Sequence, residues 1–115
     1  MNLIRTIALR VGLDELLWLL VEECAELIHA VAKLRRVRNS KNPTPVTEEE
    51  AKAALLEEIA DVSICLTALG ADSGLNRMKI QAEVDRKTRR WAERLGIDME
   101  RDVYKEGRSG NIGTH

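Results

Sequence analysis

The sequence predicts an all-α protein built as a four-helix bundle, on three observations. Aromatic residues are scarce, Phe is absent, and Ala, Leu, Glu and Arg predominate, a composition typical of helical domains. Two stretches of more than twenty residues carry apolar side chains at helical spacing, without Gly or Pro inside them. Both stretches also contain the same short acidic phrase. The 115 residues suit one domain, which on folding buries about two-thirds of the surface of its unfolded chain.

The first half of the chain contains two expected helices and a loop. Residues 2–11 have helical periodicity and end at Gly12. Asp14 is expected to N-cap a long second helix that runs to about Arg38. Residues 39–46 contain both prolines of the protein and are expected to form a loop.

The second half contains the other two expected helices. Thr47 and Glu50 form a capping box at the start of the third helix, which is expected to run to about Leu69 and stop at Gly70. A turn over residues 70–74 leads to a fourth helix, from about Leu75 to Gly96. Residues 97–104 can add one more turn, and residues 105–115 are expected to be a flexible tail. The predicted domain is therefore 1–104.

The acidic phrase is the most informative feature of the chain. Residues 20–27 read LVEECAEL and residues 55–62 read LLEEIADV, with four of eight positions identical. In each copy two acids lie three residues apart, and so adjacent on the helix surface, on the shoulder of an apolar seam: Glu23 and Glu26 in the first copy, Glu58 and Asp61 in the second. The expected seams are Leu16, Cys24, Leu27, Val31 and Leu34 in the second helix, and Ala51, Ile59, Val62, Leu66 and Leu69 in the third.

Two such helices packed seam to seam bring four carboxylates together. Carboxylates crowded at the edge of a core repel each other unless a cation neutralises them. The four acids make a set of oxygen ligands without His or Cys, which suits Mg²⁺, with Mn²⁺ possible, rather than zinc or copper. The phrase therefore predicts a metal site at Glu23, Glu26, Glu58 and Asp61.

The charge pattern bears on partners. The formal net charge is −1, which argues against bulk attraction to nucleic acid or to an anionic membrane. Acids exceed bases from residue 14 to 61, and bases exceed acids from residue 77 to 108. Lys87 and Arg90, on one face of the fourth helix, are candidates for binding the phosphates of a metal-bound substrate. Without a signal pattern or a long apolar run, and with Cys24 and Cys65 expected as reduced thiols, a cytoplasmic protein is expected.

The two phrases EECAEL and EEIADV, on helices followed by a basic helix, resemble the MazG-like nucleoside triphosphate pyrophosphohydrolases. The resemblance covers about residues 16–95 and implies that Glu23, Glu26, Glu58 and Asp61 bind Mg²⁺. It also implies hydrolysis of a nucleoside triphosphate between the α and β phosphates, giving a monophosphate and pyrophosphate. Residues 87–90 match the K-x-x-R form of the family's basic pattern, whereas the 31 residues between Glu26 and Glu58 exceed the family's usual gap.

Three alternatives remain open. A related family removes pyrophosphate from phosphoribosyl-ATP and has similar acidic phrases, but its aromatic-His pair is absent after Asp61. A carboxylate-bridged di-iron site would use Glu26 and His29 as an E-x-x-H pair, but the second helix pair supplies no His. A non-enzymatic dimerisation module is the third. Because long seams with few aromatics give one chain a thin core, a homodimer or a dimer of dimers is expected.

Overall fold

The computed structural model describes residues 2–39 and 41–103, and every element in these ranges is a helix. The all-α prediction is therefore confirmed. The elements are α1 (Leu3–Val11), α2 (Leu13–Arg38), α3 (Glu48–Asp72), α4 (Arg77–Arg94) and the π-helical turn η1 (Met99–Val103). The predicted tail of residues 105–115 lies outside the described residues. Among those residues, no helix has both the length and the apolar character needed to cross a bilayer.

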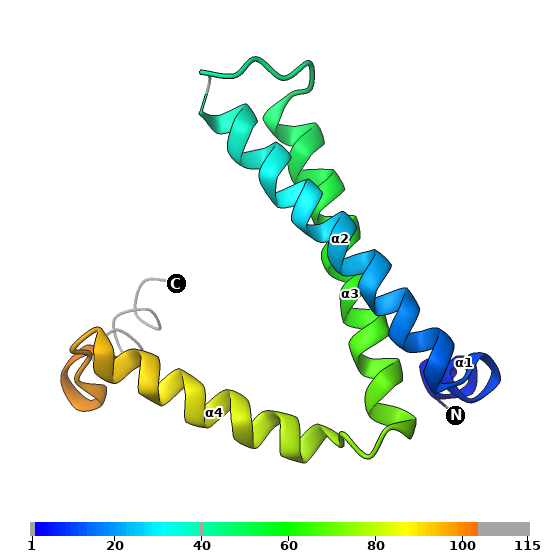
Figure 1. Ribbon diagram of the computed structural model, residues 1–115. Coiled ribbons are helices and arrows are strands. Elements are labelled where there is room, and N and C mark those ends of the chain that lie inside the picture. The colour runs from blue at the N-terminus through cyan, green and yellow to red at the C-terminus, as the bar shows by residue number, and fades with distance from the viewer. Residues whose placement is uncertain (1, 40, 104–115) are drawn as a thin grey trace, which may run out of the picture. The chain divides into compact units, whose positions relative to one another are not determined.

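The backbone contacts divide the chain into two compact units, residues 1–76 and 77–115. In the first unit, α2 and α3 lie side by side as an antiparallel hairpin, and α1 lies near the open end of that hairpin (Figure 1). Arg38 and Glu48 form an ion pair of 3.1 Å across the loop that joins α2 to α3. This unit contains the helices that carry both acidic phrases.

The helix ends confirm the predicted cap of α3 and correct the predicted cap of α2. Asn2 caps α1 and Thr47 caps α3, where the Thr47 hydroxyl accepts from the Glu50 backbone N–H at 3.1 Å. Asp14 does not cap α2, because the helix already begins at Leu13. A single residue, Gly12, with φ 90° and ψ 156°, joins α1 to α2. Asp14 instead lies in the first turn of α2, where its negative charge interacts favourably with the helix dipole.

The third helix does not stop at Gly70 as predicted but continues to Asp72. A glycine costs helix stability without breaking a helix. At this place a Cβ would come within 3.3 Å of the Leu75 carbonyl oxygen, so the missing side chain lets the following turn lie close to the helix. Gly74, with φ 75°, makes that turn, and α4 starts at Arg77, later than predicted.

The residues of α2 and α3 that face the partner helix recur along the sequence at alternating spacings of four and three residues. All fourteen positions are buried or half-buried: Leu16, Leu20, Glu23, Leu27, Ala30, Leu34 and Val37 in α2, and Glu48, Ala51, Leu55, Glu58, Val62, Cys65 and Leu69 in α3. This is the spacing at which two helices keep one seam in contact. Glu23 and Glu58 therefore occupy the middle of the seam itself.

The predicted seams are displaced relative to this arrangement. Val31, Ile59 and Leu66, which were expected to face the partner helix, are about half exposed. At about 100° per residue, the observed seams are rotated from the predicted ones toward the acidic shoulder, by about 40° in α2 and by about 20° in α3. The apolar stripe on each helix is wider than one neighbouring helix can cover, so its pattern alone does not select the half that becomes buried.

The core at the open end of the hairpin is small. Ala8 of α1 packs with Leu16, Ala68 and Leu69, and Ile4 and Leu20 lie against this group. In the second unit α4 has no buried residue. It ends in a Schellman motif, where the Ile97 N–H donates to the Ala92 carbonyl and the Gly96 N–H to the Glu93 carbonyl. The turn η1 confirms the predicted extra turn after Gly96.

Candidate metal centre

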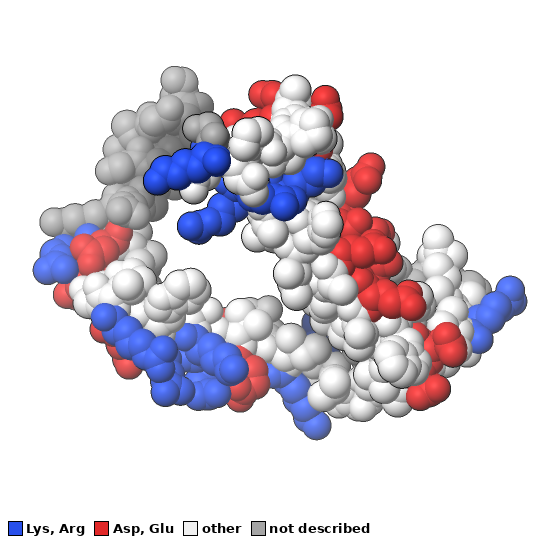
Figure 2. Space-filling model, turned by 45° about the horizontal axis from the view of Figure 1, so that its top comes forward, with Lys and Arg blue, Asp and Glu red and all other residues white. Residues whose placement is uncertain are grey.

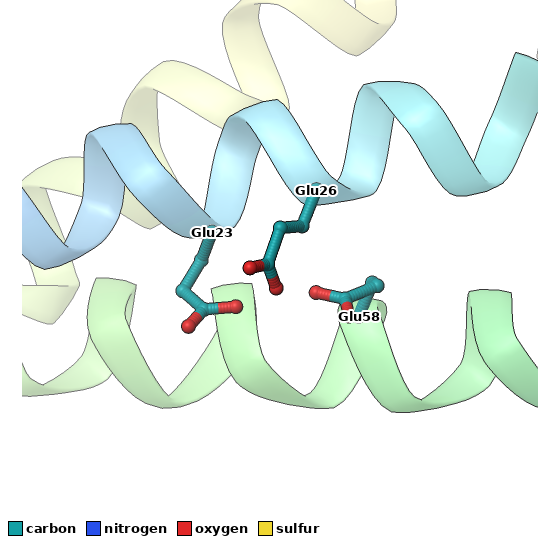
Figure 3. Close-up of side chains that lie close together, drawn as sticks. All are labelled: Glu23, Glu26 and Glu58. Carbon is teal, nitrogen blue, oxygen red and sulfur yellow. The ribbon is translucent and has the colours of Figure 1, made fainter.

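Three of the four predicted carboxylates meet between the two long helices. Glu23 and Glu26 project from α2 and Glu58 projects from α3, all into the space between the helices (Figure 3). One oxygen from each of the three lies within 4.8 Å of the other two. Opposite ligands of a Mg²⁺ ion lie about 4.2 Å apart. Small side-chain movements would therefore close the three oxygens around one ion.

The seam positions explain why this cluster is unusual. Glu23 Oε2 and Glu58 Oε2 have lost contact with solvent, and neither has a hydrogen-bond partner among the described residues. A buried carboxylate oxygen without a partner destabilises a fold, and such oxygens are rare in native proteins. Leu27 and Val62 occupy neighbouring seam positions, and the carboxyl groups of Glu23 and Glu58 can hydrogen-bond to each other only when one of them carries a proton. A bound cation would satisfy both oxygens at once.

The electrostatics of the cluster favour a positive charge. Burial, followed by the negative charges of Glu26 and Glu23, raises the pKa of Glu58 to about 7. Burial and the charges of Glu26 and Asp61 also raise the pKa of Glu23 above its usual range. Both shifts record the cost of keeping these carboxylates ionised side by side. A divalent cation removes that cost, while protonation of one carboxyl is the alternative in the metal-free chain.

Asp61 does not join the 4.8 Å cluster. It lies one turn after Glu58, is half-buried, and acts on the cluster through its charge, which raises the pKa of both Glu23 and Glu58. Its shorter side chain explains the difference, since a carboxylate on one fewer methylene reaches less far from the helix. The structure therefore brings together three of the four predicted residues and places the fourth beside them.

The remaining candidates lie elsewhere. Lys87 and Arg90 are exposed on α4, in the second compact unit, one turn apart. His29, the residue needed for a di-iron site, is exposed and takes no part in the cluster. Cys24 and Cys65 are free thiols, as predicted, and burial raises the pKa of the Cys65 thiol.

A further feature lies toward the C-terminal end of α2. Val31, Leu34, Arg35, Arg38 and Asn39 line an open cavity of about 580 Å³. Arg35 follows Glu26 by nine residues, so the cavity lies about 14 Å along the helix from the cluster. The basic run at the end of α2 was a signal for anion binding there, but a run of this kind also complements a helix dipole.

Comparison with known proteins adds no identification: no family model, no curated protein and no solved structure matches this chain. The functional argument therefore rests on the geometry and chemistry of the site.

Proposed function

We propose that this chain is a Mg²⁺-dependent nucleoside triphosphate pyrophosphohydrolase of the MazG-like kind, active as a homodimer or a dimer of dimers. One observation carries the proposal: two facing helices place buried, partnerless carboxylate oxygens of Glu23 and Glu58 next to a third acid, Glu26. A structural role does not account for them, because apolar residues at these seam positions would pack better. The duplicated phrases and their family resemblance support the substrate class.

The donor set fits a hard divalent ion. All three oxygens come from carboxylates, which Mg²⁺ and Mn²⁺ prefer, and no sulfur or imidazole ligand is present in the cluster. Glu23, Glu26 and Glu58 would hold the ion, and Asp61 would complete the set after a small movement of its side chain. When bound, Mg²⁺ neutralises phosphate charge and helps to orient and activate an attacking water.

The reaction follows from these roles. Water attacks the α-phosphorus of the nucleotide, and the bond from that phosphorus to the oxygen bridging the α and β phosphates breaks. Pyrophosphate leaves with the electron pair of that bond, and a carboxylate oxygen of the cluster that is not a ligand accepts the proton of the water. Lys87 and Arg90 are proposed to bind the phosphates that leave, where negative charge grows in the transition state.

Each acidic phrase supplies its own control for testing the proposal. Glu57 and Glu58 are adjacent glutamates on α3, but Glu57 is exposed whereas Glu58 lies in the seam. With Mg²⁺ and nucleoside triphosphates, Glu58→Gln should lower pyrophosphate release by about a hundredfold or more, and Glu57→Gln should change it little. A folded Glu58→Gln protein with unchanged Mg²⁺-dependent activity would remove the basis of the proposal.

A further inference from the structure

The charges of α2 are divided between the two halves of the helix. Residues 13–26 contain five acids and no Lys or Arg, whereas residues 27–38 contain four Lys and Arg and no acid. The cluster of Glu23, Glu26 and Glu58 lies at the boundary between the two halves. A nucleotide held at this cluster through its α-phosphate extends its other phosphates along α2 in one direction or the other. The charges along the helix bear on that direction.

Helix geometry places Lys33 on the same side of α2 as the cluster. At about 100° per residue, Lys33 lies about 20° round the helix from Glu26, and the two positions are separated by about 10.5 Å along the axis. Helical side chains lean toward the N-terminus of their helix, so the long stem of Lys33 leans toward the cluster. The arginines of α2 lie further round from Glu26, by about 80° for Arg36, about 120° for Arg38 and about 180° for Arg35.

The surroundings of Lys33 differ from those of the other bases of α2. Lys33 is half-buried, whereas the three arginines of the helix are exposed. The acids of α3 that lie nearest to it on this side of the hairpin are Glu50 and Glu57, and Lys33 forms no ion pair with these or with any other residue that the structure describes. A partly desolvated ammonium without a partner gains more from a bound anion than a fully solvated one does.

Toward the open end of the hairpin, the two long helices offer negative charge. Glu15 and Glu22 of α2 lie within about 40° of Glu26 round the helix, and residues 62–72 of α3 contain no Lys or Arg. Acidic side chains form a band along the hairpin (Figure 2). Phosphates extended in this direction meet like charges, which is unfavourable. The opposite end of the hairpin, where the loop joins α2 to α3, is the loop end, and phosphates extended toward it meet Lys33.

We propose that a metal-bound nucleoside triphosphate lies along α2 with its β- and γ-phosphates toward the loop end, where the ammonium of Lys33 binds the γ-phosphate. This inference rests on the proposed function and adds a donor to those proposed on α4. A nucleoside diphosphate held at the same cluster ends one phosphate earlier and does not reach Lys33. The contact therefore makes the site select triphosphates over diphosphates.

Nucleotide analogues with a methylene group between the α- and β-phosphorus test binding separately from hydrolysis, because that bond is not cleaved. In isothermal titration calorimetry with Mg²⁺ and such analogues of the standard nucleoside triphosphates, Lys33→Met should weaken the tightest binding about tenfold, as expected for the loss of one charge-assisted hydrogen bond. Lys33→Arg should retain most of the affinity. Binding of the corresponding diphosphate analogue, which is weaker in the unmodified chain, should change little in either variant.

Lys52 provides the matched control. It is an exposed lysine of α3 that lies about 180° round the helix from Asp61, so Lys52→Met should bind the triphosphate analogue as the unmodified chain does. Circular dichroism establishes that each variant is helical before its affinity is compared. If Lys33→Met does not fold, Lys33→Gln takes its place.

The outcomes separate this inference from the proposed function. Equal affinity of Lys33→Met and Lys52→Met for the triphosphate analogue overturns the inference, even if the unmodified chain hydrolyses nucleotides. An equal loss of affinity for the triphosphate and diphosphate analogues also overturns it. An unmodified chain that binds no triphosphate analogue overturns the inference and the proposed function together. A preference for the triphosphate that depends on Lys33, in a chain that hydrolyses no nucleotide, supports the inference and contradicts the proposed function alone.

Discussion

At the scale of single residues, the proposed chemistry rests on the carboxyl groups of Glu23 and Glu58. Each occupies a seam position that an apolar side chain would fill in a purely structural hairpin, and each keeps one buried oxygen without a partner. A carboxylate at a core position goes against the usual apolar packing of a helix pair. Two such carboxylates on facing helices are expected at a functional site. The neighbouring residues Glu22 and Glu57 have the same side chain but are exposed.

The stability of the metal-free chain should depend on pH in a direction that these residues determine. Glu58 has a pKa of about 7 in the folded chain against an ordinary value of 4.5, and the pKa of Glu23 is shifted in the same direction. Between pH 4.5 and about pH 7, the folded state therefore binds more protons than the unfolded state. Stability from this source is therefore complete below about pH 4.5 and is lost as the pH rises through about 7.

Thermal unfolding followed by circular dichroism in the presence of a chelator checks this trend. The midpoint should fall from pH 5 to pH 8 more steeply for the unmodified chain than for Glu58→Gln, which has no proton to lose. Adding Mg²⁺ at pH 8 should raise the midpoint of the unmodified chain, since a ligand that binds only the folded state stabilises it. A chelated protein that becomes more stable between pH 5 and pH 7, relative to Glu58→Gln, would contradict the account.

At the scale of elements, much of the fold was predictable and the register of the hairpin was not. Periodicity and caps predicted both long helices, because the signals at Thr47 and around residues 39–46 are local. Which flank of each apolar stripe becomes buried depends on the facing helix, so Val31 and Ile59 were expected inside and lie outside. For the same reason the acids were expected on the shoulder of the seam, whereas Glu23 and Glu58 lie in it.

The candidate site followed from repetition more than from any single motif. One helical pair of acids is common on protein surfaces, but two copies in register implied that they meet, and three of the four carboxylates do. Asp61 stays outside the cluster for a local reason, because its side chain is one methylene shorter than that of glutamate. The length of a side chain and the exact distance between two helices are not encoded in a residue pattern.

The one-residue joint between α1 and α2 gives a prediction at this scale. Gly12 has φ 90° and ψ 156°, a region that is almost restricted to glycine. Gly12→Ala should lower the free energy of unfolding by about 1–3 kcal/mol, as measured by urea denaturation. Gly70→Ala is the comparison: alanine gains about 1 kcal/mol of helix propensity within α3, but its Cβ would come within 3.3 Å of the Leu75 carbonyl oxygen, so the two effects oppose each other and the net change should be smaller than at Gly12. A Gly12→Ala protein as stable as the unmodified chain would show that the joint carries no strain.

For the whole molecule, the proposed reaction needs donors to the phosphates that leave, and Lys87 and Arg90 are the proposed donors. Lys87 and Arg90 lie one turn apart on α4, and Arg89 is exposed on a different side of it. Arg90→Ala should raise the Michaelis constant and lower the turnover number together, by about tenfold or more in their ratio, because it removes a charged donor to the leaving phosphates. Arg89→Ala should change both little, and neither variant should alter stability, since exposed arginines contribute little to it.

Steady-state kinetics with a nucleoside triphosphate and Mg²⁺ separate these outcomes. If Lys87→Ala, Arg90→Ala and Arg89→Ala all retain full activity, α4 takes no part in binding phosphate. Arg35 and Arg38, which line the cavity at the end of α2, would then be the donors to test.

The most direct test of the central claim is to identify the products by phosphorus NMR. The purified chain is incubated with Mg²⁺ and a set of standard, deoxy and damaged nucleoside triphosphates. The account predicts that pyrophosphate and the nucleoside monophosphate appear in equal amounts for at least one nucleotide, and that a chelator stops the reaction. The appearance of a nucleoside diphosphate with inorganic phosphate, or no product from any nucleotide in the presence of Mg²⁺ or Mn²⁺, would contradict it.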